Sequence, residues 1–298
     1  MSHRAALVLV MVMAAAGCRA QTPPTAGQST PANQPRIVSL SPAISRSLVD
    51  LSIGDLVVGR TPFCHSINDS VPVVGDLYNL NYEQLVRLKP THVLAQPPTG
   101  SIDQHLRELA DQRGWTLAQW KLNGIADIET LVRELPEAVF QGDKPRLAAA
   151  SARAAQILND LAEQLSPGPA AARVFQGRTL LIASVDPILA FADETYLDDV
   201  LAALQANNAA PGTGWVELSY EDVVRINPDA IILVRETIHD GDGESSSLTS
   251  LRNLDVEAAR SGRITELVHP DALLPSSSVR EVAAALRGIL SSFESSQQ

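Results

Sequence analysis

Cys64 and His65 stand next to each other, and both residue types can bind metals. A thiolate or an imidazole could coordinate a metal ion, either in the protein or in a bound molecule. Free cysteine, however, is more often simply buried as a small apolar side chain. His239 and His269 could add ligands, but the spacing of these residues fits no zinc pattern. We therefore predict no resident metal or cofactor, and keep Cys64 and His65 as candidate contacts to a bound molecule.

The motifs of common enzymes are missing from the sequence. It contains no GxSxG elbow, no P-loop and no HExxH. Gly212-Thr213-Gly214 lacks the third glycine and the strand–helix context of a dinucleotide site. These observations predict a binding protein rather than an enzyme. A redox or metal enzyme built on Cys64 stays an alternative, and it predicts that the thiol is alkylated rapidly.

A sequence motif that occurs twice predicts the elements that position the candidate residues. Residues 80–95 read LNYEQLVRLKPTHVLA, and residues 218–233 read LSYEDVVRINPDAIIL. The second residue of each copy, Asn81 or Ser219, is a good helix N-cap. Pro90 and Pro228 should end these helices and push the residue before them to extended backbone. The apolar runs that follow suit buried strands, so the repeat predicts two lobes of similar plan.

Strands and helices alternate along both halves, as in an α/β fold around a mostly parallel sheet. Between the halves, apolar residues recur at three- and four-residue steps over 145–166, which predicts one continuous amphipathic helix. We therefore predict two similar Rossmann-like α/β lobes joined by one long rigid helix. The N-terminal lobe spans residues 36–144 and the C-terminal lobe residues 177–298.

Residues 1–18 have the pattern of an export signal. Arg4 precedes an apolar run that is too short to span a bilayer, and the run ends in Ala-Ala-Gly-Cys. Small residues directly before a cysteine resemble the lipobox of bacterial lipoproteins, so we expect lipidation at Cys18. A plain signal peptide cut nearby is the alternative. Residues 19–35 are rich in Pro, Thr, Gln and Ala and predict a disordered tether. The chain is expected to be exported to the periplasm or cell surface and anchored to a membrane by lipid.

The charge of the chain excludes one class of partner. The formal net charge is −11, whereas a nucleic-acid binder would need a basic face. The hydrophobic fraction of 45% is ordinary for a globular protein, so sizeable cores can form. We therefore predict no nucleic-acid partner.

Several phrases recur in the order and spacing of a known family. They are RIVSLSP (36–42), VVGD with NYEQLVRLKPTHVLA (73–95), TYLDDVLAAL (195–204), W-x-x-x-S-x-E (215–221) and NPDAIILV (227–234). Together they resemble the bacterial substrate-binding proteins that feed ABC importers of cobalamin, iron-siderophores and haem. The vitamin B12-binding branch resembles the chain most, through Phe63 and through Trp215, which precedes Glu221 by six positions.

The resemblance implies a monomer that captures cobalamin or another corrinoid in a cleft between the lobes and delivers it to an ABC permease and its ATPase. An iron-siderophore or haem is the alternative ligand, and a surface sensor or adaptor without transport is the alternative role. The resemblance also implies that a glutamate on each lobe pairs with arginines of the permease. These are Glu83 and Glu221. Alternatively, both glutamates serve only the helix dipole.

Ligands of open α/β sheets bind at loops beyond the carboxyl ends of the strands. A large planar or macrocyclic ligand would use aromatic faces and a few polar anchors there. The residues predicted to contact it are Phe63, Cys64, His65, Tyr78, Gln96 and Trp120 in the first lobe, and Leu189, Trp215, Arg235, His269 and Asp271 in the second. Trp215 is the strongest candidate, because its spacing from Glu221 matches the family. For Trp120, a core position explains the residue equally well.

Overall fold

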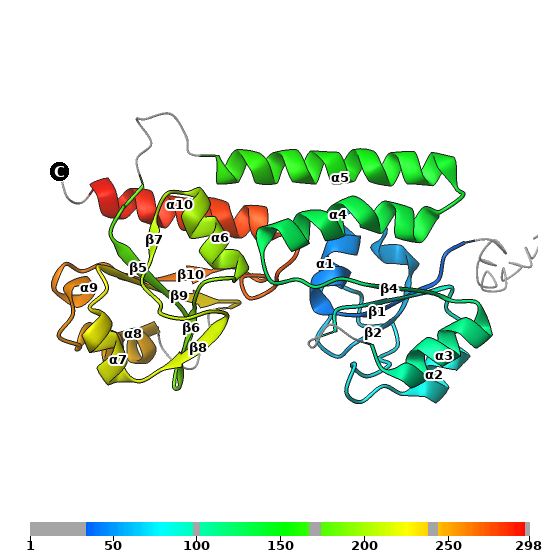
Figure 1. The fold of residues 1–298 in the computed structure, drawn as a ribbon, viewed down its shortest axis with the longest axis horizontal. Coiled ribbons are helices and arrows are strands. Elements are labelled where there is room, and N and C mark those ends of the chain that lie inside the picture. Colours follow the sequence, from blue (N-terminus) through cyan, green and yellow to red (C-terminus); the bar gives the residue numbers. More distant parts are fainter. Residues whose placement is uncertain (1–33, 98–101, 167–173, 238–243, 296–298) are drawn as a thin grey trace, which may run out of the picture. The chain divides into compact units, whose positions relative to one another are not determined.

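The computed structural model describes residues 34–97, 102–166, 174–237 and 244–295 (Figure 1). The predicted signal peptide with Cys18, most of the predicted tether and His239 therefore lie outside the described residues. Residues Pro35–Gln298 form one compact unit.

The first lobe is built on a sheet of four parallel strands in the order β2-β1-β3-β4. The strands are β1 (Ile37–Leu40), β2 (Val57–Arg60), β3 (His92–Ala95) and β4 (Thr116–Gln119). The helices that alternate with them are α1 (Pro42–Asp50), the 3-10 turn η1 (Gly54–Leu56), α2 (Tyr82–Arg87), α3 (Gln104–Arg113) and α4 (Ile125–Phe140). Because all four strands run in one direction, the loops that follow them meet at one edge of the sheet.

The second lobe has a mixed sheet in the order β10-β9-β5-β6-β8, with β7 beside β5. Its strands are β5 (Arg178–Val185), β6 (Ile188–Phe191), β7 (Asn207–Asn208), β8 (Trp215–Leu218), β9 (Ala230–Arg235) and β10 (Ile264–Val268). Its helices are α6 (Tyr196–Ala203), α7 (Tyr220–Ile226), α8 (Glu244–Arg252), α9 (Glu257–Arg260) and α10 (Val279–Ser295). The predicted α/β class with two lobes is confirmed. Strands β6 and β8 were not predicted, and β6 runs antiparallel to both of its neighbours, β5 and β8.

The repeated phrase forms the same pair of elements in both lobes. Asn81 Oδ1 accepts the N–H of Gln84 at 2.9 Å where α2 begins. Ser219 Oγ accepts the N–H of Asp222 at 3.1 Å where α7 begins. A proline and a parallel strand, β3 or β9, follow each helix. The prediction of a capped helix, a proline stop and a strand is therefore confirmed in both copies.

The backbone before each proline differs from the prediction. Lys89 and Asn227 precede Pro90 and Pro228, and their φ angles are 48° and 46°. Both residues are thus left-handed, and the predicted extended backbone is wrong at these positions. Proline disfavours right-handed geometry in the residue before it, whereas a helix commonly ends on a left-handed residue. At both positions the residue adopts the left-handed backbone that ends a helix, and not the extended backbone that a following proline favours.

The helix predicted between the halves is α5 (Lys144–Leu165). It packs along α4 of the first lobe and against α10 of the second (Figure 1). Arg287 of α10 donates to the backbone oxygen of Ser166 at 2.6 Å and to that of Gln164. One face of α5 is buried through Ala150, Ala154, Ile157 and Leu161. The helix therefore contacts both lobes along its length rather than bridging them freely.

One apolar core cluster extends through both lobes. It includes Leu48 and Trp120 of the first lobe, Ile157 of α5, and Phe191 and Leu286 of the second. Two smaller clusters belong to the second and the first lobe separately. Because buried apolar area contributes about 25 cal/mol per Å², any motion that separated the lobes at this core would be costly.

Candidate ligand-binding site

Phe63 lies in the loop after β2, and contacts within that loop hold it in place. Arg60 is buried, and its guanidinium donates to Asp69 at 2.9 Å and to the backbone oxygen of Val71 at 3.2 Å. The N–H of Phe63 donates to Thr61 Oγ1 at 3.2 Å. Phe63 nevertheless remains 58% exposed. A large apolar ring on a braced loop is a candidate contact for an apolar ligand.

Cys64 and His65 differ in accessibility although they are adjacent. Cys64 is fully buried, and its Sγ lies 3.1 Å from Thr61 Oγ1. His65 is exposed, and its N–H donates to the backbone oxygen of Phe63 at 3.0 Å. Structural buried cysteines are generally inert, so the exposed imidazole is the group of this pair that can meet a bound molecule.

Tyr78 lies in a tight turn before α2. Asp76 Oδ1 accepts the N–H of Tyr78 at 2.8 Å and that of Asn79 at 2.9 Å. Gly75 has φ 89°, and a Cβ added there would lie 2.0 Å from the backbone oxygen of Asn79. The turn therefore requires glycine at this position. It presents Tyr78 with 78% of its surface exposed.

Trp215 begins the edge strand β8 rather than lying in a loop. It is opposite Phe191 of β6, and the two ring centroids are 4.2 Å apart. Phe191 is fully buried, whereas Trp215 is 47% exposed. Leu189 lies two residues before Phe191 and so shares its face of the sheet. The structure thus brings Leu189 and Trp215 together on one face of the β6–β8 pair.

Gln96 and Trp120 are held by the first lobe itself. Gln96 follows β3, and its Oε1 accepts the hydroxyl of Ser41, the N-cap of α1, at 2.8 Å. Trp120 follows β4 and is 7% exposed, and its Nε1 donates to Glu134 of α4 at 2.8 Å. Trp120 therefore lies in the core cluster, the position that was given as the alternative to a ligand contact.

Arg235 ends β9 and is paired. Its Nη1 lies 2.8 Å from Glu266 Oε1 on the neighbouring strand β10, and both side chains are largely buried. Pairing of this kind holds the guanidinium in a fixed orientation, while it also balances the charge.

His269 and Asp271 belong to a group of charged side chains that joins the lobes. We call this group the interlobe ion cluster, and its members are Arg46 and Asp50 of α1 with His269, Asp271, Arg280 and Glu281 of the second lobe. The N–H of Asp271 donates to His269 Nδ1 at 3.1 Å, so His269 Nε2 carries hydrogen toward Glu281 Oε2 at 3.1 Å. Arg46 lies 3.2 Å from Asp271 and thus links these residues to the first lobe.

Reasoning from the sequence missed the residues through which the lobes meet. Asp50 accepts from Ser277 and Arg280 of the second lobe, at 2.8 and 3.0 Å. Asp199 of α6 accepts the N–H of Ile125 in the first lobe at 2.7 Å. Asp199 lies within TYLDDVLAAL (195–204), one of the segments that carry the family resemblance. Nothing in its local sequence pattern indicates a partner so distant in the chain.

Glu83 and Glu221 occupy the first turns of α2 and α7, and both are exposed. Glu83 pairs with Arg87 at 2.6 Å. In α7 the matching arginine pairs instead with Asp222, so Glu221 has no ion pair among the described residues. The Ser219 N–H and hydroxyl, with Arg225, lower the pKa of Asp222. In Figure 1 both helices lie on the side of this unit away from α5.

The repeat tyrosines help to hold these two helices. Tyr82 donates to Asp103 of the first lobe at 3.1 Å, and Tyr220 donates to the backbone oxygen of Val185 at 3.1 Å. Burial, together with the Asp103 carboxylate, raises the pKa of Tyr82 to about 12. Tyr82 therefore stays protonated and donates its hydrogen bond at any physiological pH.

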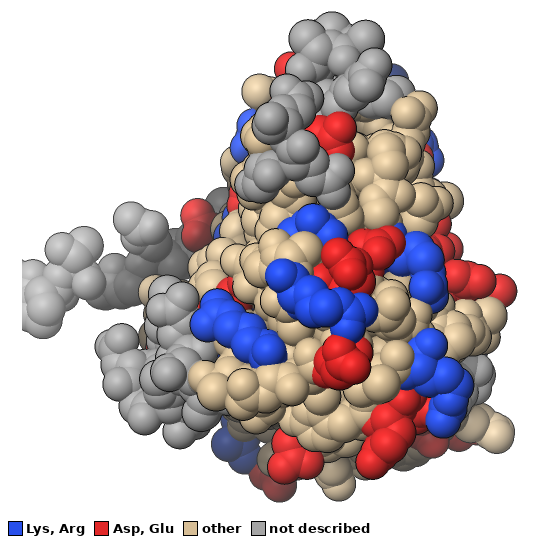
Figure 2. Space-filling model, turned by 90° about the vertical axis from the view of Figure 1, so that its left-hand side faces the viewer, with Lys and Arg blue, Asp and Glu red and all other residues tan. Residues whose placement is uncertain are grey.

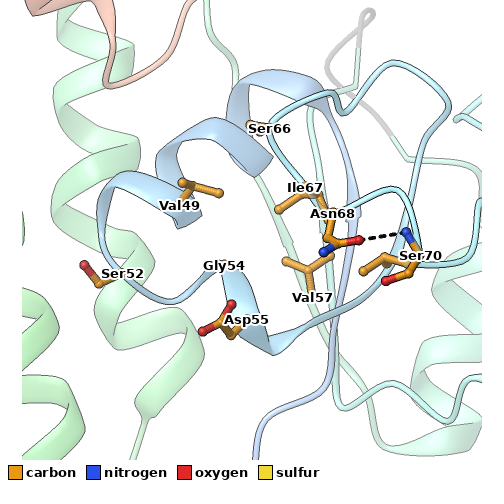
Figure 3. A pocket seen from close by; sticks show the side chains of 10 residues that line it. Val49, Ser52, Gly54, Asp55, Val57, Ser66, Ile67, Asn68 and Ser70 are labelled. Carbon is orange, nitrogen blue, oxygen red and sulfur yellow. Dashed lines mark hydrogen bonds between the residues drawn. The ribbon is translucent and has the colours of Figure 1, made fainter.

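A hollow of about 490 Å³ lies in the first lobe, between α1, η1 and the loop after β2 (Figure 3). Val49, Val57 and Ile67 form its apolar part, and Asp55 and Asn68 lie on its polar side. Asn68 Oδ1 is already engaged by the N–H of Ser70, at 2.9 Å (Figure 3). The candidate ligand contacts do not line this hollow.

Two further properties concern metals and membranes. Within the described residues, no three His, Cys, Asp or Glu side chains are grouped closely enough to hold a metal ion. Among the helices of the same residues, none combines the length and the apolar character that crossing a bilayer requires.

Acidic and basic side chains are interleaved on the face seen in Figure 2. Ion pairs account for such mixing in the second lobe, where Arg260 pairs with Asp255 at 2.5 Å and Arg263 with Glu257 at 3.5 Å. A binder of nucleic-acid phosphates needs a continuous basic face, and the described part of this face does not offer one.

Comparison with known sequences identifies a family. The model of a family described as periplasmic binding protein matches residues 37–267. A relative from Bacillus subtilis (strain 168), named "Uncharacterized ABC transporter substrate-binding lipoprotein YvrC", is 28% identical over 211 residues, 66% of this chain and 62% of the relative. The chain thus matches less than two thirds of that relative's length.

Solved structures share the fold. A possible iron-binding periplasmic protein from Staphylococcus epidermidis has a TM-score of 0.66 at 21% identity, over 85% of this chain and 97% of that one. The heme-binding RhuT from Roseiflexus sp. RS-1 gives 0.64 at 20%, over 89% and 100%. The vitamin B12-binding BtuF of Vibrio cholerae gives 0.65 at 18%, over 88% and 98%. With the family match over most of both lobes, the chain belongs to the periplasmic binding protein family.

Proposed function

We propose that this chain is a lipid-anchored substrate-binding protein of an ABC importer. It captures a corrinoid such as cobalamin between its lobes and delivers it to a permease that works with an ATPase. Membership of the periplasmic binding protein family supports the capture of a small molecule. The name of the Bacillus subtilis relative supports export, a lipid at Cys18 and an ABC partner.

The observation that carries the proposal is the exposure of large aromatic side chains on both lobes. Phe63 and Tyr78 are 58% and 78% exposed in the first lobe, and Trp215 is 47% exposed in the second. Each is held by specific contacts of its loop or strand, so its exposure is a property of the fold. Exposed rings on both lobes suit a large, flat and partly apolar ligand.

The ligand class rests on the names of the solved relatives and on two aromatic residues. The solved relatives are named for iron, heme and vitamin B12, so their names support a metal chelate without distinguishing its type. The preference for a corrinoid rests on Phe63 and on the position of Trp215 before Glu221. An iron-siderophore or haem is the alternative ligand of the same site. His65, Leu189 and Arg235 would supply further contacts.

Glu83 and Glu221 would dock the permease. They lie at matching steps of the repeat, one on each lobe, and both are exposed. Arginines on the permease would then fix the register and speed the encounter more than they would add affinity.

A binding screen tests the proposal. The full chain is titrated by calorimetry with cobalamin, cobinamide, ferric siderophores and haem. Saturable binding of a corrinoid at one site supports the proposal as stated. Binding of haem or a ferric siderophore alone replaces the ligand and keeps the role, and the absence of binding by all four classes contradicts the role itself.

A further inference from the structure

We propose that Asp50 and Asp199 are positioning residues that fix the angle between the two lobes. The inference rests on the proposed function, because the angle sets the distance between the ligand contacts of one lobe and those of the other.

Asp50 joins three parts of the chain. Its side chain is 7% exposed, and it accepts from Arg46 of its own helix at 2.7 Å. It also accepts from Ser277 at 2.8 Å and from Arg280 at 3.0 Å, both in the second lobe. The backbone oxygen of Asp50 accepts from Arg153 of α5 at 2.9 Å. A single residue thus connects the first lobe, the connecting helix and the second lobe.

Separating the lobes at Asp50 would break an ion pair and a hydrogen bond between largely buried groups, although Asp50 would keep Arg46 and Arg280 would keep Glu281. Asp50 and Arg280 are 7% and 12% exposed, and each loses its partner in the other lobe when the contact opens. Hydrogen bonds to charged groups are stronger than neutral ones and depend on their geometry. The contact therefore resists rotation as well as separation.

Asp199 acts at a second point by capping a helix of the other lobe. The N-cap of α4 is Gly124, which has no side chain to accept the orphan N–H groups of the first turn. Asp199 Oδ2 accepts the N–H of Ile125 at 2.7 Å instead. A Cβ on residue 124 would lie 2.6 Å from this oxygen, so glycine makes room for the carboxylate. The negative charge also suits the N-terminus of this helix.

Tyr196 connects the two points within the second lobe. It lies on α6 with Asp199, it is 3% exposed, and its hydroxyl donates to the backbone oxygen of Ala272 at 2.5 Å. Ala272 follows Asp271, which pairs with Arg46 in the first lobe. The two polar contacts and α5 thus form separate connections between the lobes. A hinge rotation must break at least one of them, whereas the apolar core alone is non-directional.

The test measures the interlobe distance directly and needs no ligand. Nitroxide labels are attached at Asp111→Cys on α3 and Arg252→Cys on α8, both exposed, in the full chain with Cys18→Ser. Cys64 is fully buried and stays unlabelled. Pulsed electron paramagnetic resonance then compares Asp50→Asn, Asp199→Asn and the double variant with wild type. Asp222→Asn is the matched control, because it removes a helix-capping carboxylate within one lobe.

The proposal predicts a single narrow distance distribution for wild type and the control. Each interlobe variant should broaden it, the double variant most, with the open population raised by roughly tenfold or more. Ser277→Ala, which removes one neutral donor, gives a milder variant if Asp50→Asn does not fold. A merely structural role would lower the melting temperature without broadening. Distributions that superimpose on wild type in the double variant overturn the proposal.

A second measurement separates this inference from the proposed function. Cobalamin and haemin are titrated into wild type and the double variant, and the ligand that binds should bind at least about tenfold more weakly when the angle is no longer fixed. If neither probe binds wild type, the proposed ligand fails, while the spin-label result still decides the positioning role. Equal affinity in wild type and a broadened double variant would contradict the link between lobe angle and binding.

Discussion

At the scale of single residues, solvent accessibility distinguishes candidate ligand contacts that sequence reasoning could not rank. Phe63 and Cys64 are neighbours, yet the ring is exposed and the thiol is buried. Sequence patterns place residues after strands, but they do not show which side chain turns inward. That depends on loop contacts such as the one between Cys64 and Thr61, which only the folded loop brings together.

Trp120 allows a test of this difference. Trp120→Phe keeps most of the buried ring but removes the donor to Glu134, so the free energy of unfolding should fall by about 1 kcal/mol. Because Trp120 is buried in the core, ligand affinity should stay at the wild-type value. Denaturant unfolding and calorimetry measure the two effects. A loss of affinity at unchanged stability would instead return Trp120 to the ligand contacts.

Asp222 gives a prediction about pH. Its pKa is lowered in the folded state, so the carboxylate form favours folding. Its contribution is present above the unfolded pKa of about 4 and is lost as the pH falls through the folded value. The difference in melting temperature between wild type and Asp222→Asn should therefore be largest near pH 6 and should shrink below about pH 4. A difference that stays constant down to pH 2 would contradict this role.

At the scale of elements, local rules predicted most of what the structure contains. The N-caps of the repeat helices, Asn81 and Ser219, could be predicted because capping depends on a few adjacent residues. The left-handed Lys89 and Asn227 were not predicted, because two local rules conflict there. Strands β6 and β8 were missed as well. β6 follows β5 after only Asp186-Pro187, which is not one of the Asn-Gly or Asp-Gly pairs that signal a tight hairpin, and β8 pairs with β6.

The turn that carries Tyr78 yields a prediction at this scale. Gly75→Ala would place a Cβ against the backbone oxygen of Asn79, in addition to the strain of a positive φ, and should cost more than about 1 kcal/mol of stability. Gly114→Ala is the matched control, because its φ is also positive but no atom lies within 4 Å of the added Cβ. Thermal or denaturant unfolding compares them. Equal losses in both variants would show that the close approach at Gly75 is unimportant.

At the scale of the whole molecule, the sequence predicted two lobes and a long helix but not how the lobes meet. The two-lobe plan is visible because a repeat and an amphipathic period are sequence patterns. The contact of Asp50 with Arg280 joins residues 230 positions apart, and no periodicity links them. The candidate site shares this limit, because its two groups of contacts come from different lobes.

The proposed docking to a permease gives a prediction at the same scale. Reversing both charges, Glu83→Arg with Glu221→Arg, should abolish uptake and leave ligand affinity unchanged, because both side chains are exposed on helices away from α5. Uptake of labelled cobalamin in cells and calorimetry of the purified protein measure the two effects. Glu221→Arg alone should cost more uptake than Glu83→Arg, since Glu83 already shares its charge with Arg87. Unimpaired uptake in the double variant would rule out these docking residues.

The central claim is that one ligand is held by both lobes at once. Calorimetric titration of wild type, Phe63→Ala and Trp215→Ala with the ligand found in the screen tests it most directly. Phe63 and Trp215 lie in different lobes, so each substitution should weaken the same one-to-one complex by roughly tenfold or more. Wild-type affinity in either variant would mean that the ligand rests on a single lobe, and would contradict the account.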